Sequence, residues 1–178
     1  SDLSWKVADG PIVRNNVYLG EVYDARREKR GWDKPGFTAA GWRTPALAQA
    51  PVGRLVAEPQ PPIRITEQWN PIQVTQPKPG VFVYDCGVNF SGWARIKFEA
   101  PAGTRLSLRY GELLHADGTL NPMTSVAGQI KREGVGGPGA PPIAWQEDVV
   151  IARGGGETYT PRFTWHGFRY LEVTGLST

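Results

Sequence analysis

The stretch RLSLRY, residues 105–110, alternates apolar side chains with charged or polar ones. The same alternation occurs in ARIKFE, residues 94–99. A side-chain period of two places the apolar groups on one face of an extended chain, which is the pattern of a half-buried β-strand. Residues 100–104 (APAGT) lie between the two stretches and contain proline and glycine. They predict a hairpin loop that joins two neighbouring antiparallel strands.

Strand patterns recur along the chain, and no stretch shows a long helical period. The run VFVY, residues 81–84, is apolar on both faces and predicts a central strand. Residues 62–66, 147–152 and 168–173 are further strand candidates. So many short strands favour an all-β fold, specifically an antiparallel β-sandwich. The side chains expected in its core are Phe98, Leu106, Leu108, Phe168 and Tyr170.

The composition excludes several classes of protein. The chain has 178 residues with 40% hydrophobic content, enough for about one folded domain with a core. Its net charge of +3 comes from interspersed acidic and basic residues, which does not indicate a nucleic-acid partner. No apolar run is long enough to indicate a membrane partner. The single cysteine, Cys86, excludes an internal disulfide and a thiolate zinc cluster, and we expect it to be a buried small hydrophobe.

Residues 44–62 contain five prolines and mark a composition break. Proline lacks a donor N–H and restricts the residue before it, so this stretch is expected to be an extended connector. We therefore predict an N-terminal segment at 1–45, a linker at 46–60 and the sandwich at 61–178. The segment is too short to be stable alone, so it should pack on the sandwich or on another part of a larger protein. The glycine-rich stretch 134–142 is expected to be a loop.

The most promising polar residues lie in NVYLGEVYDAR, residues 16–26. If this run is a strand, Glu21 and Tyr23 share one face, while Asp24 and Arg26 share the other. Carboxylate, phenol and guanidinium groups bind sugar hydroxyls through directional hydrogen bonds. The alternative is that the aspartate and the arginine form an ion pair that ties this segment to a neighbouring domain. The sequence leaves both interpretations open.

The chain contains seven tryptophans, and each is either a platform for a sugar ring or part of a core or interface. Trp93 and Trp165 are the platform candidates that accompany the polar run. Asp85 and Asn89 offer oxygen ligands, but calcium takes about six to eight, so no metal site is predicted. No phosphate loop or metal-ligand cluster is present, so no cofactor is predicted.

A glycosidase needs two carboxyl groups, one on each side of the bond that it cleaves. None of the candidate carboxylates lies in a distinctive motif, so the sequence predicts no catalytic residue. The candidates by residue type alone are Glu112, Glu147, Asp148 and Glu157.

Several strings match a known family in their order along the chain. They are GPI (10–12), YLGEVYDARRE (18–28), GWD (31–33), FTAAGW (37–42), PPIRITE (61–67), YDCGVNFSGWARI (84–96), PAGTRLSLRYGELLHADGTL (101–120) and YTPRFTWHGFRYLEVTG (159–175). Together they resemble the middle of bacterial α-L-rhamnosidases of glycoside hydrolase family 78. The glycine-rich stretch 134–142 departs from the usual pattern of that family.

The resemblance implies one module of a larger enzyme. Members of the family are inverting hydrolases that release terminal α-L-rhamnose and combine β-sandwich domains with a catalytic (α/α)-barrel. This chain resembles the tail of the jelly-roll domain followed by the concanavalin-like sandwich. The helical region with the catalytic acids has no counterpart here, so no catalytic residue carries over and the barrel is the expected partner.

Three functional hypotheses follow from the resemblance. The first is a non-catalytic accessory domain of an α-L-rhamnosidase. The alternative is a carbohydrate-binding module that recognises rhamnose or a rhamnose-containing polysaccharide, and the third is an autonomous small hydrolase. For the parent protein, a periplasmic or extracellular location is favoured over the cytoplasm.

Overall fold

A computed structural model of the chain describes residues 2–125 and 145–176, so the predicted loop at 134–142 lies outside the described residues. The structure divides into two compact units. The first comprises Ser1–Gly10 and Lys29–Trp69, and the second comprises Pro11–Glu28 and Asn70–Thr178.

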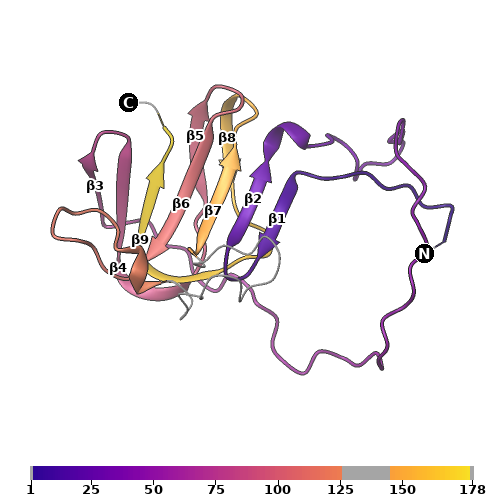
Figure 1. Cartoon of the computed structure of the whole chain (residues 1–178), viewed down its shortest axis with the longest axis horizontal. Coiled ribbons are helices and arrows are strands. Elements are labelled where there is room, and N and C mark those ends of the chain that lie inside the picture. Colours follow the sequence, from indigo (N-terminus) through magenta and orange to yellow (C-terminus); the bar gives the residue numbers. More distant parts are fainter. Residues whose placement is uncertain (1, 126–144, 177–178) are drawn as a thin grey trace, which may run out of the picture. The chain divides into compact units, whose positions relative to one another are not determined.

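All the strands belong to the second unit (Figure 1). Seven strands form one sheet in the order β1-β2-β7-β6-β9-β4-β3, and β5 and β8 form a second sheet. The all-β sandwich prediction is therefore confirmed. The larger sheet is mixed rather than purely antiparallel, because β2 and β7 run parallel. The elements are β1 (Ile12–Asn16), β2 (Gly20–Asp24), η1 (Ala25–Arg27), β3 (Gln73–Lys78), β4 (Val81–Gly92), β5 (Ile96–Ala100), β6 (Arg105–Gly111), η2 (Pro122–Thr124), β7 (Glu147–Ile151), β8 (Gly155–Tyr159) and β9 (His166–Thr174).

The apolar core of this unit takes side chains from both sheets. On β6, Leu106 and Leu108 are completely buried, and Phe168 of β9 lies beside them in the same cluster. Phe98 of β5 is partly buried and packs against this cluster. Cys86 is also partly buried against the core rather than fully enclosed, so its predicted burial is only partial. The alternating pattern on β6 therefore identified the buried face correctly.

Tyr170 is the one predicted core residue that the structure places elsewhere. It is half-buried and outside the core cluster, whereas Phe168 and Leu171 both belong to that cluster. Regular alternation cannot bury both of these residues on one face. The pairing of β4 with β9 is irregular at this point, because β4 carries the extra residues 86–89. Such a bulge exchanges the two faces of a strand, and it places Tyr170 opposite Asp85 on the other face.

Two other predictions from local pattern are wrong. Residues 100–104 do not close a hairpin, because β5 pairs with β8, while β6 pairs with β7 and β9. The connection instead passes from the smaller sheet to the larger one. Residues 62–66 form no strand. Alternation identifies an extended segment but not its partner, and the prolines at 61 and 62 remove two backbone donors that a ladder would use.

The N-terminal strands contribute to the sheet of the second unit. β1 pairs with β2, and β2 pairs with β7, where Val22 lies opposite Val149. The predicted boundaries between 1–45, 46–60 and 61–178 stay predictions, but the sheet includes strands from both sides of them. The polar run at 16–26 is thereby built into the sheet.

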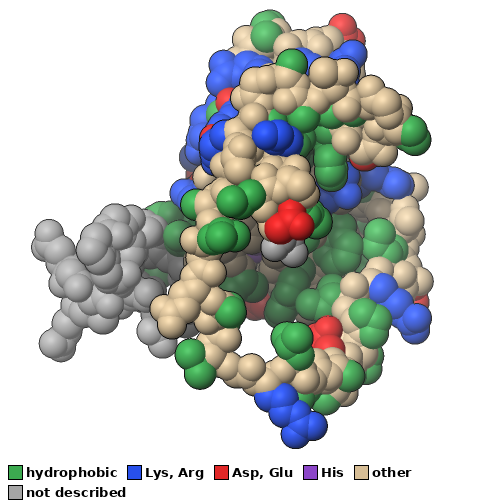
Figure 2. All heavy atoms as spheres, turned by 90° about the vertical axis from the view of Figure 1, so that its right-hand side faces the viewer, with side chains coloured by type: hydrophobic (Ala, Val, Ile, Leu, Met, Phe, Trp, Pro, Cys, Tyr) green, Lys and Arg blue, Asp and Glu red, His purple; other side chains and the backbone are tan. Residues whose placement is uncertain are grey.

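The first unit has little regular structure. It contains an isolated β-bridge between Val7 and Arg43, an ion pair of Arg43 with Asp9 at 3.0 Å, and an edge contact between Phe37 and Trp42. Figure 2 shows hydrophobic side chains at the surface of the chain. The large exposed apolar residues of this unit include Leu3, Trp5, Trp32, Leu47, Val52, Leu55, Val56, Ile63, Ile65 and Trp69. In the part of the chain that the structure describes, no helix is long and apolar enough to cross a membrane.

Candidate functional site

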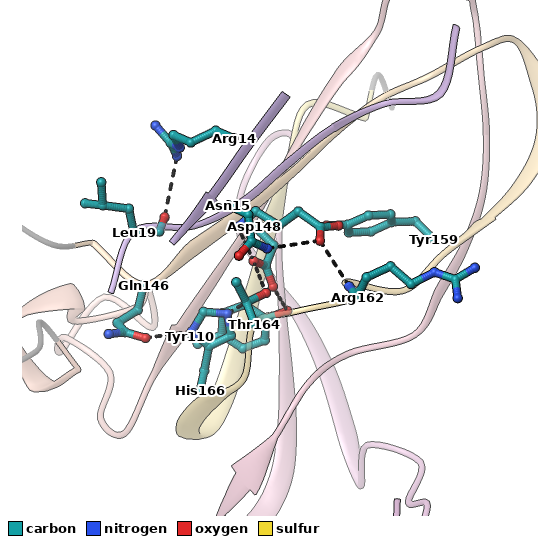
Figure 3. Close-up of polar contacts among 11 residues, drawn as sticks. Arg14, Asn15, Leu19, Tyr110, Gln146, Asp148, Tyr159, Arg162, Thr164 and His166 are labelled. Carbon is teal, nitrogen blue, oxygen red and sulfur yellow. Dashed lines mark hydrogen bonds and ion pairs between the residues drawn. The ribbon is translucent and has the colours of Figure 1, made fainter. Parts of the chain in front are cut away.

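Polar side chains concentrate inside the second unit, where β2, β6, β7 and β9 approach one another (Figure 3). Glu21, Tyr110, Asp148 and His166 are each at most 1% exposed. Two carboxyl groups, a phenol and an imidazole are the groups that acid–base catalysis uses, so this buried polar cluster is the first candidate for a site by residue type.

Asp148 of β7 lies at the centre of the cluster. Its Oδ1 accepts hydrogen bonds from the backbone N–H of Glu21 at 2.8 Å and from the hydroxyl of Thr164 at 3.0 Å. Its Oδ2 accepts a hydrogen bond from the Tyr110 hydroxyl at 2.8 Å and lies 3.0 Å from Nε2 of His166. Both oxygens are therefore fully used by other parts of the chain.

His166 is held on both sides. Its Nδ1 lies 2.7 Å from Oε1 of Gln146, and its ring stacks on Tyr110 with 4.0 Å between the centroids. Gln146 adopts a φ of 53°, a left-handed conformation that is uncommon outside glycine. Burial raises the pKa of the Tyr110 hydroxyl, and the charge of Asp148 raises it further, so this hydroxyl remains a hydrogen-bond donor. The imidazole thus has no free nitrogen for a substrate.

Glu21 forms a second layer of the cluster. Its Oε1 accepts a hydrogen bond from the Tyr159 hydroxyl at 3.1 Å, and its Oε2 accepts from the Arg162 backbone N–H at 3.1 Å and from Asn15 at 3.4 Å. Burial raises the pKa of Glu21, and the nearby charge of Asp148 acts in the same direction, while the hydrogen bonds oppose them. Ionised Glu21 is therefore costly for the folded state.

The cluster has the chemistry of a structural network. Among the described residues, no buried side-chain nitrogen or oxygen lacks a hydrogen-bond partner. The described residues also contain no group of three or more His, Cys, Asp or Glu side chains that is arranged to hold a metal ion. Satisfied polar networks rigidify a core, whereas a catalytic carboxyl must reach its substrate. The arrangement joins side chains of β1, β2, β6, β7, β8 and β9, but it offers no accessible reactive atom.

The other members of the predicted sugar-binding set lie next to this cluster in sequence but differ in exposure. Tyr23 is half-buried, and its hydroxyl donates to Glu28 at 2.8 Å. Asp24 accepts two hydrogen bonds from the guanidinium of Arg26, at 2.8 and 2.9 Å. Asp24 also accepts from the Arg26 backbone N–H and thereby caps η1. The ion pair of the alternative interpretation therefore exists, and it joins residues of a single unit.

The two predicted tryptophan platforms lie in different surroundings. Trp165 is 42% exposed, although its neighbours Thr164 and His166 are buried parts of the polar cluster. Its side chain therefore points away from the cluster, as alternation along an extended chain requires. Trp93 follows β4 and is half-buried. Sugar binding by the set Glu21, Tyr23, Asp24, Arg26, Trp93 and Trp165 stays a prediction.

Three of the candidate carboxylates are held by the chain in ways that the sequence did not reveal. Besides Asp148, Glu147 accepts a hydrogen bond from Ser107, and Glu157 accepts from the backbone N–H groups of residues 153 and 154. Glu112 is exposed. The buried polar cluster was missed as a unit because β7 and β9 are neighbours only through β6. A sequence signal for the cluster was available, because the acidic Asp148 shares a strand face with the apolar Val150.

Two family models match the chain. The model described as "Bacterial alpha-L-rhamnosidase concanavalin-like domain" matches residues 75–178. The model described as "Alpha-L-rhamnosidase N-terminal domain" matches residues 1–67.

Individual relatives match over nearly the whole chain. An alpha-L-rhamnosidase of Streptomyces avermitilis is 40% identical over 97% of this chain, and one of Formosa agariphila is 30% identical over 100%. The chain spans only 15% and 18% of the lengths of these relatives.

Solved structures of similar proteins share the fold. The alpha-L-rhamnosidase of Dictyoglumus thermophilum matches 100% of this chain and 18% of its own, with a TM-score of 0.84 at 43% identity. The Streptomyces avermitilis alpha-L-rhamnosidase, solved in complex with L-rhamnose, matches 99% of this chain and 16% of its own, with a TM-score of 0.84 at 40% identity.

Proposed function

Because the chain belongs to the bacterial α-L-rhamnosidase family, through its concanavalin-like domain at residues 75–178, we propose that it is a non-catalytic accessory β-sandwich of a larger α-L-rhamnosidase. The parent enzyme would hydrolyse terminal α-L-rhamnose from glycans or glycosides. The small share of the relatives' length that the chain spans, 15% and 18%, leaves most of such a protein for catalysis.

The observation that carries this proposal is the enclosure of the buried polar cluster. Its two carboxylates, Glu21 and Asp148, are both 0% exposed and have hydrogen-bond partners at every oxygen. A glycosidase needs two carboxyl groups that reach opposite sides of one glycosidic bond. Buried carboxyl groups that already join strands through hydrogen bonds cannot reach a glycosidic bond, so the cluster supports a structural role.

The expected partner is the catalytic (α/α)-barrel of the same polypeptide. The segment between β8 and β9 supports a docking role, because Phe163 is 70% exposed and Trp165 is 42% exposed, while Thr164 between them is buried in the polar cluster. Exposed aromatic side chains on a rigid support are typical of interfaces. The buried polar cluster would then fix the backbone from which these two side chains project.

An activity assay tests the non-catalytic role. The purified chain, incubated with a chromogenic α-L-rhamnoside, is expected to give no turnover above the buffer rate. Turnover that persists through repurification and falls in Glu112→Gln would contradict the proposal. Glu112 is exposed, so this substitution leaves the fold intact and any loss reports on chemistry.

The second candidate function is carbohydrate binding by the exposed part of the predicted set. A related structure was solved in complex with L-rhamnose, and Arg26 and Trp165 are exposed here. Under this alternative, rhamnose causes saturable NMR shifts at residues 21–26 and Tyr23→Ala weakens its binding, although the loss of a side chain that packs against the core also lowers thermal stability. Under the docking role, the same substitution lowers stability or solubility, and rhamnose causes no NMR shifts at residues 21–26.

A further inference from the structure

A small cavity opens on the face of the larger sheet that points away from the apolar core. Two cross-strand rows form its floor: Gln73 of β3 lies opposite Asp85 of β4, which lies opposite Tyr170 of β9, and Thr75 lies opposite Val83. The cavity has a volume of about 170 Å³. Its lining consists of Gln73, Thr75, Val83, Asp85, Leu114 and Tyr170.

The edge strand supplies groups that are free to bind a ligand. Gln73 and Thr75 are exposed on β3, and neither side chain makes a hydrogen bond to another residue within 2–125 and 145–176. An amide offers two donor hydrogens and an acceptor, and a hydroxyl offers one donor and an acceptor. Because the two residues are two positions apart on a strand, their side chains point to the same side.

The charged group in the inner wall is paired within the chain, so the wall has no net charge. Asp85 accepts two hydrogen bonds from the Arg169 guanidinium, both at 2.8 Å, and a third from the Gly87 backbone N–H at 2.6 Å. The Arg169 hydrogen bonds lower the pKa of Asp85, so the carboxylate stays ionised and paired. Arg169 also lies 4.9 Å above the ring of Tyr170. A wall whose charges are already matched favours a neutral ligand over a cation or an anion.

The remaining lining is apolar. Tyr170 and Leu114 are half-buried, and Val83 is 2% exposed at the floor. A sugar ring combines an apolar C–H face with an edge of hydroxyl groups, so it matches a wall with an aromatic and aliphatic side opposite amide and hydroxyl groups. The volume lies below the roughly 300–1,000 Å³ of pockets for drug-sized ligands, which restricts the occupant to one ring.

We propose that this cavity binds a single neutral monosaccharide unit. The cavity uses none of the residues in the 21–26 run, so it is a different site from the one that the sequence suggested. The proposal also goes beyond the accessory role, because a domain that only docks to a barrel has no use for a sugar site. Failure of either proposal leaves the other standing.

An NMR titration of the ¹⁵N-labelled chain tests the site. L-rhamnose and D-glucose are added separately up to high millimolar concentration. At least one is expected to cause saturable shifts in the amides of residues 73–75 and 83–85 and of Tyr170. Gln73→Ala should weaken that binding by roughly three- to tenfold, as the loss of one hydrogen bond does. Because Gln73 is exposed on an edge strand, this variant should fold normally.

Gln60→Ala is the matched control, since it removes the same amide from an exposed position outside the cavity. It should bind as the wild type does. Three results would overturn the proposal: no saturable shift with either sugar, shifts confined to residues outside the cavity such as 21–26, or equal affinity in Gln73→Ala and Gln60→Ala.

Discussion

Asp148 and Asp24 are two carboxylates with similar partners and different surroundings. Each accepts a hydrogen bond from a backbone N–H and others from side chains. Both aspartates are buried, Asp148 at 0% and Asp24 at 8% exposure, but the guanidinium that pairs with Asp24 belongs to Arg26, whose side chain is 50% exposed. Water can replace a lost partner of Asp24, but it cannot reach the partners of Asp148. Loss of the carboxylate should therefore destabilise the fold more at Asp148 than at Asp24.

The largest expected effect comes from removing the buried carboxylate. Asp148→Ala removes the hydrogen bonds that Asp148 makes with the Glu21 backbone N–H and with the side chains of Tyr110, Thr164 and His166. Because these groups stay buried, we expect a loss of about 3–5 kcal/mol in the free energy of unfolding. Asp24→Ala removes the cap of η1 and should cost about 0.5–2 kcal/mol. Urea unfolding measures both. Equal losses would show that the exposure of the partner groups does not distinguish the two sites.

An apolar pair sharpens the same comparison. Leu108 is 0% exposed in the core, and Leu55 is 99% exposed in the first unit. Leu108→Ala should cost about 2–5 kcal/mol, because it removes buried methyl groups and leaves a cavity. Leu55→Ala should change stability by no more than about 0.5 kcal/mol. A thermal midpoint of Leu108→Ala that equals that of the wild type would contradict the packing of β6.

The smallest effect is the pH dependence that Glu21 causes. Its pKa is raised in the folded state above the ordinary value of 4.5, so the folded chain binds a proton there more readily than the unfolded chain. The resulting destabilisation is present above the folded pKa and disappears as the pH falls below it. The stability of the wild type relative to Glu21→Gln should therefore rise as the pH falls through the folded pKa towards 4.5, with a slope of at most about 1.4 kcal/mol per pH unit. A difference that stays flat, or falls, with acid would contradict the assignment.

The sequence was most informative about single strands. The alternation in residues 105–110 identified Leu106 and Leu108 as buried, because one face of β6 contacts the core. The alternation does not indicate which strands pair, so the prediction of a hairpin loop at residues 100–104 was wrong. At Tyr170 the prediction failed because the bulge at residues 86–89 of β4 shifts the pairing with β9, and no local pattern in β9 records a change in its partner.

The candidate site was harder to predict than the fold. Glu21 was singled out for sugar binding because it lies in a polar run, yet its carboxylate faces Tyr159, which is 138 residues away in the sequence. Asp148 was recognised only as a carboxylate, since its contacts with Glu21 and His166 depend on the order of strands in the sheet. Long-range contacts of this kind have no local signature, so the chemistry of these residues became visible only in three dimensions.

Native-state hydrogen exchange tests the central claim most directly, which is that the buried polar cluster belongs to the folding core and not to a site that opens for substrate. The decisive amide is that of Glu21, which donates to Asp148. It should exchange only through global unfolding, with the same free energy of opening as the amides of β6. A free energy of opening for the Glu21 amide near that of the exposed residues 46–60 would show that the cluster opens locally, and it would contradict the account.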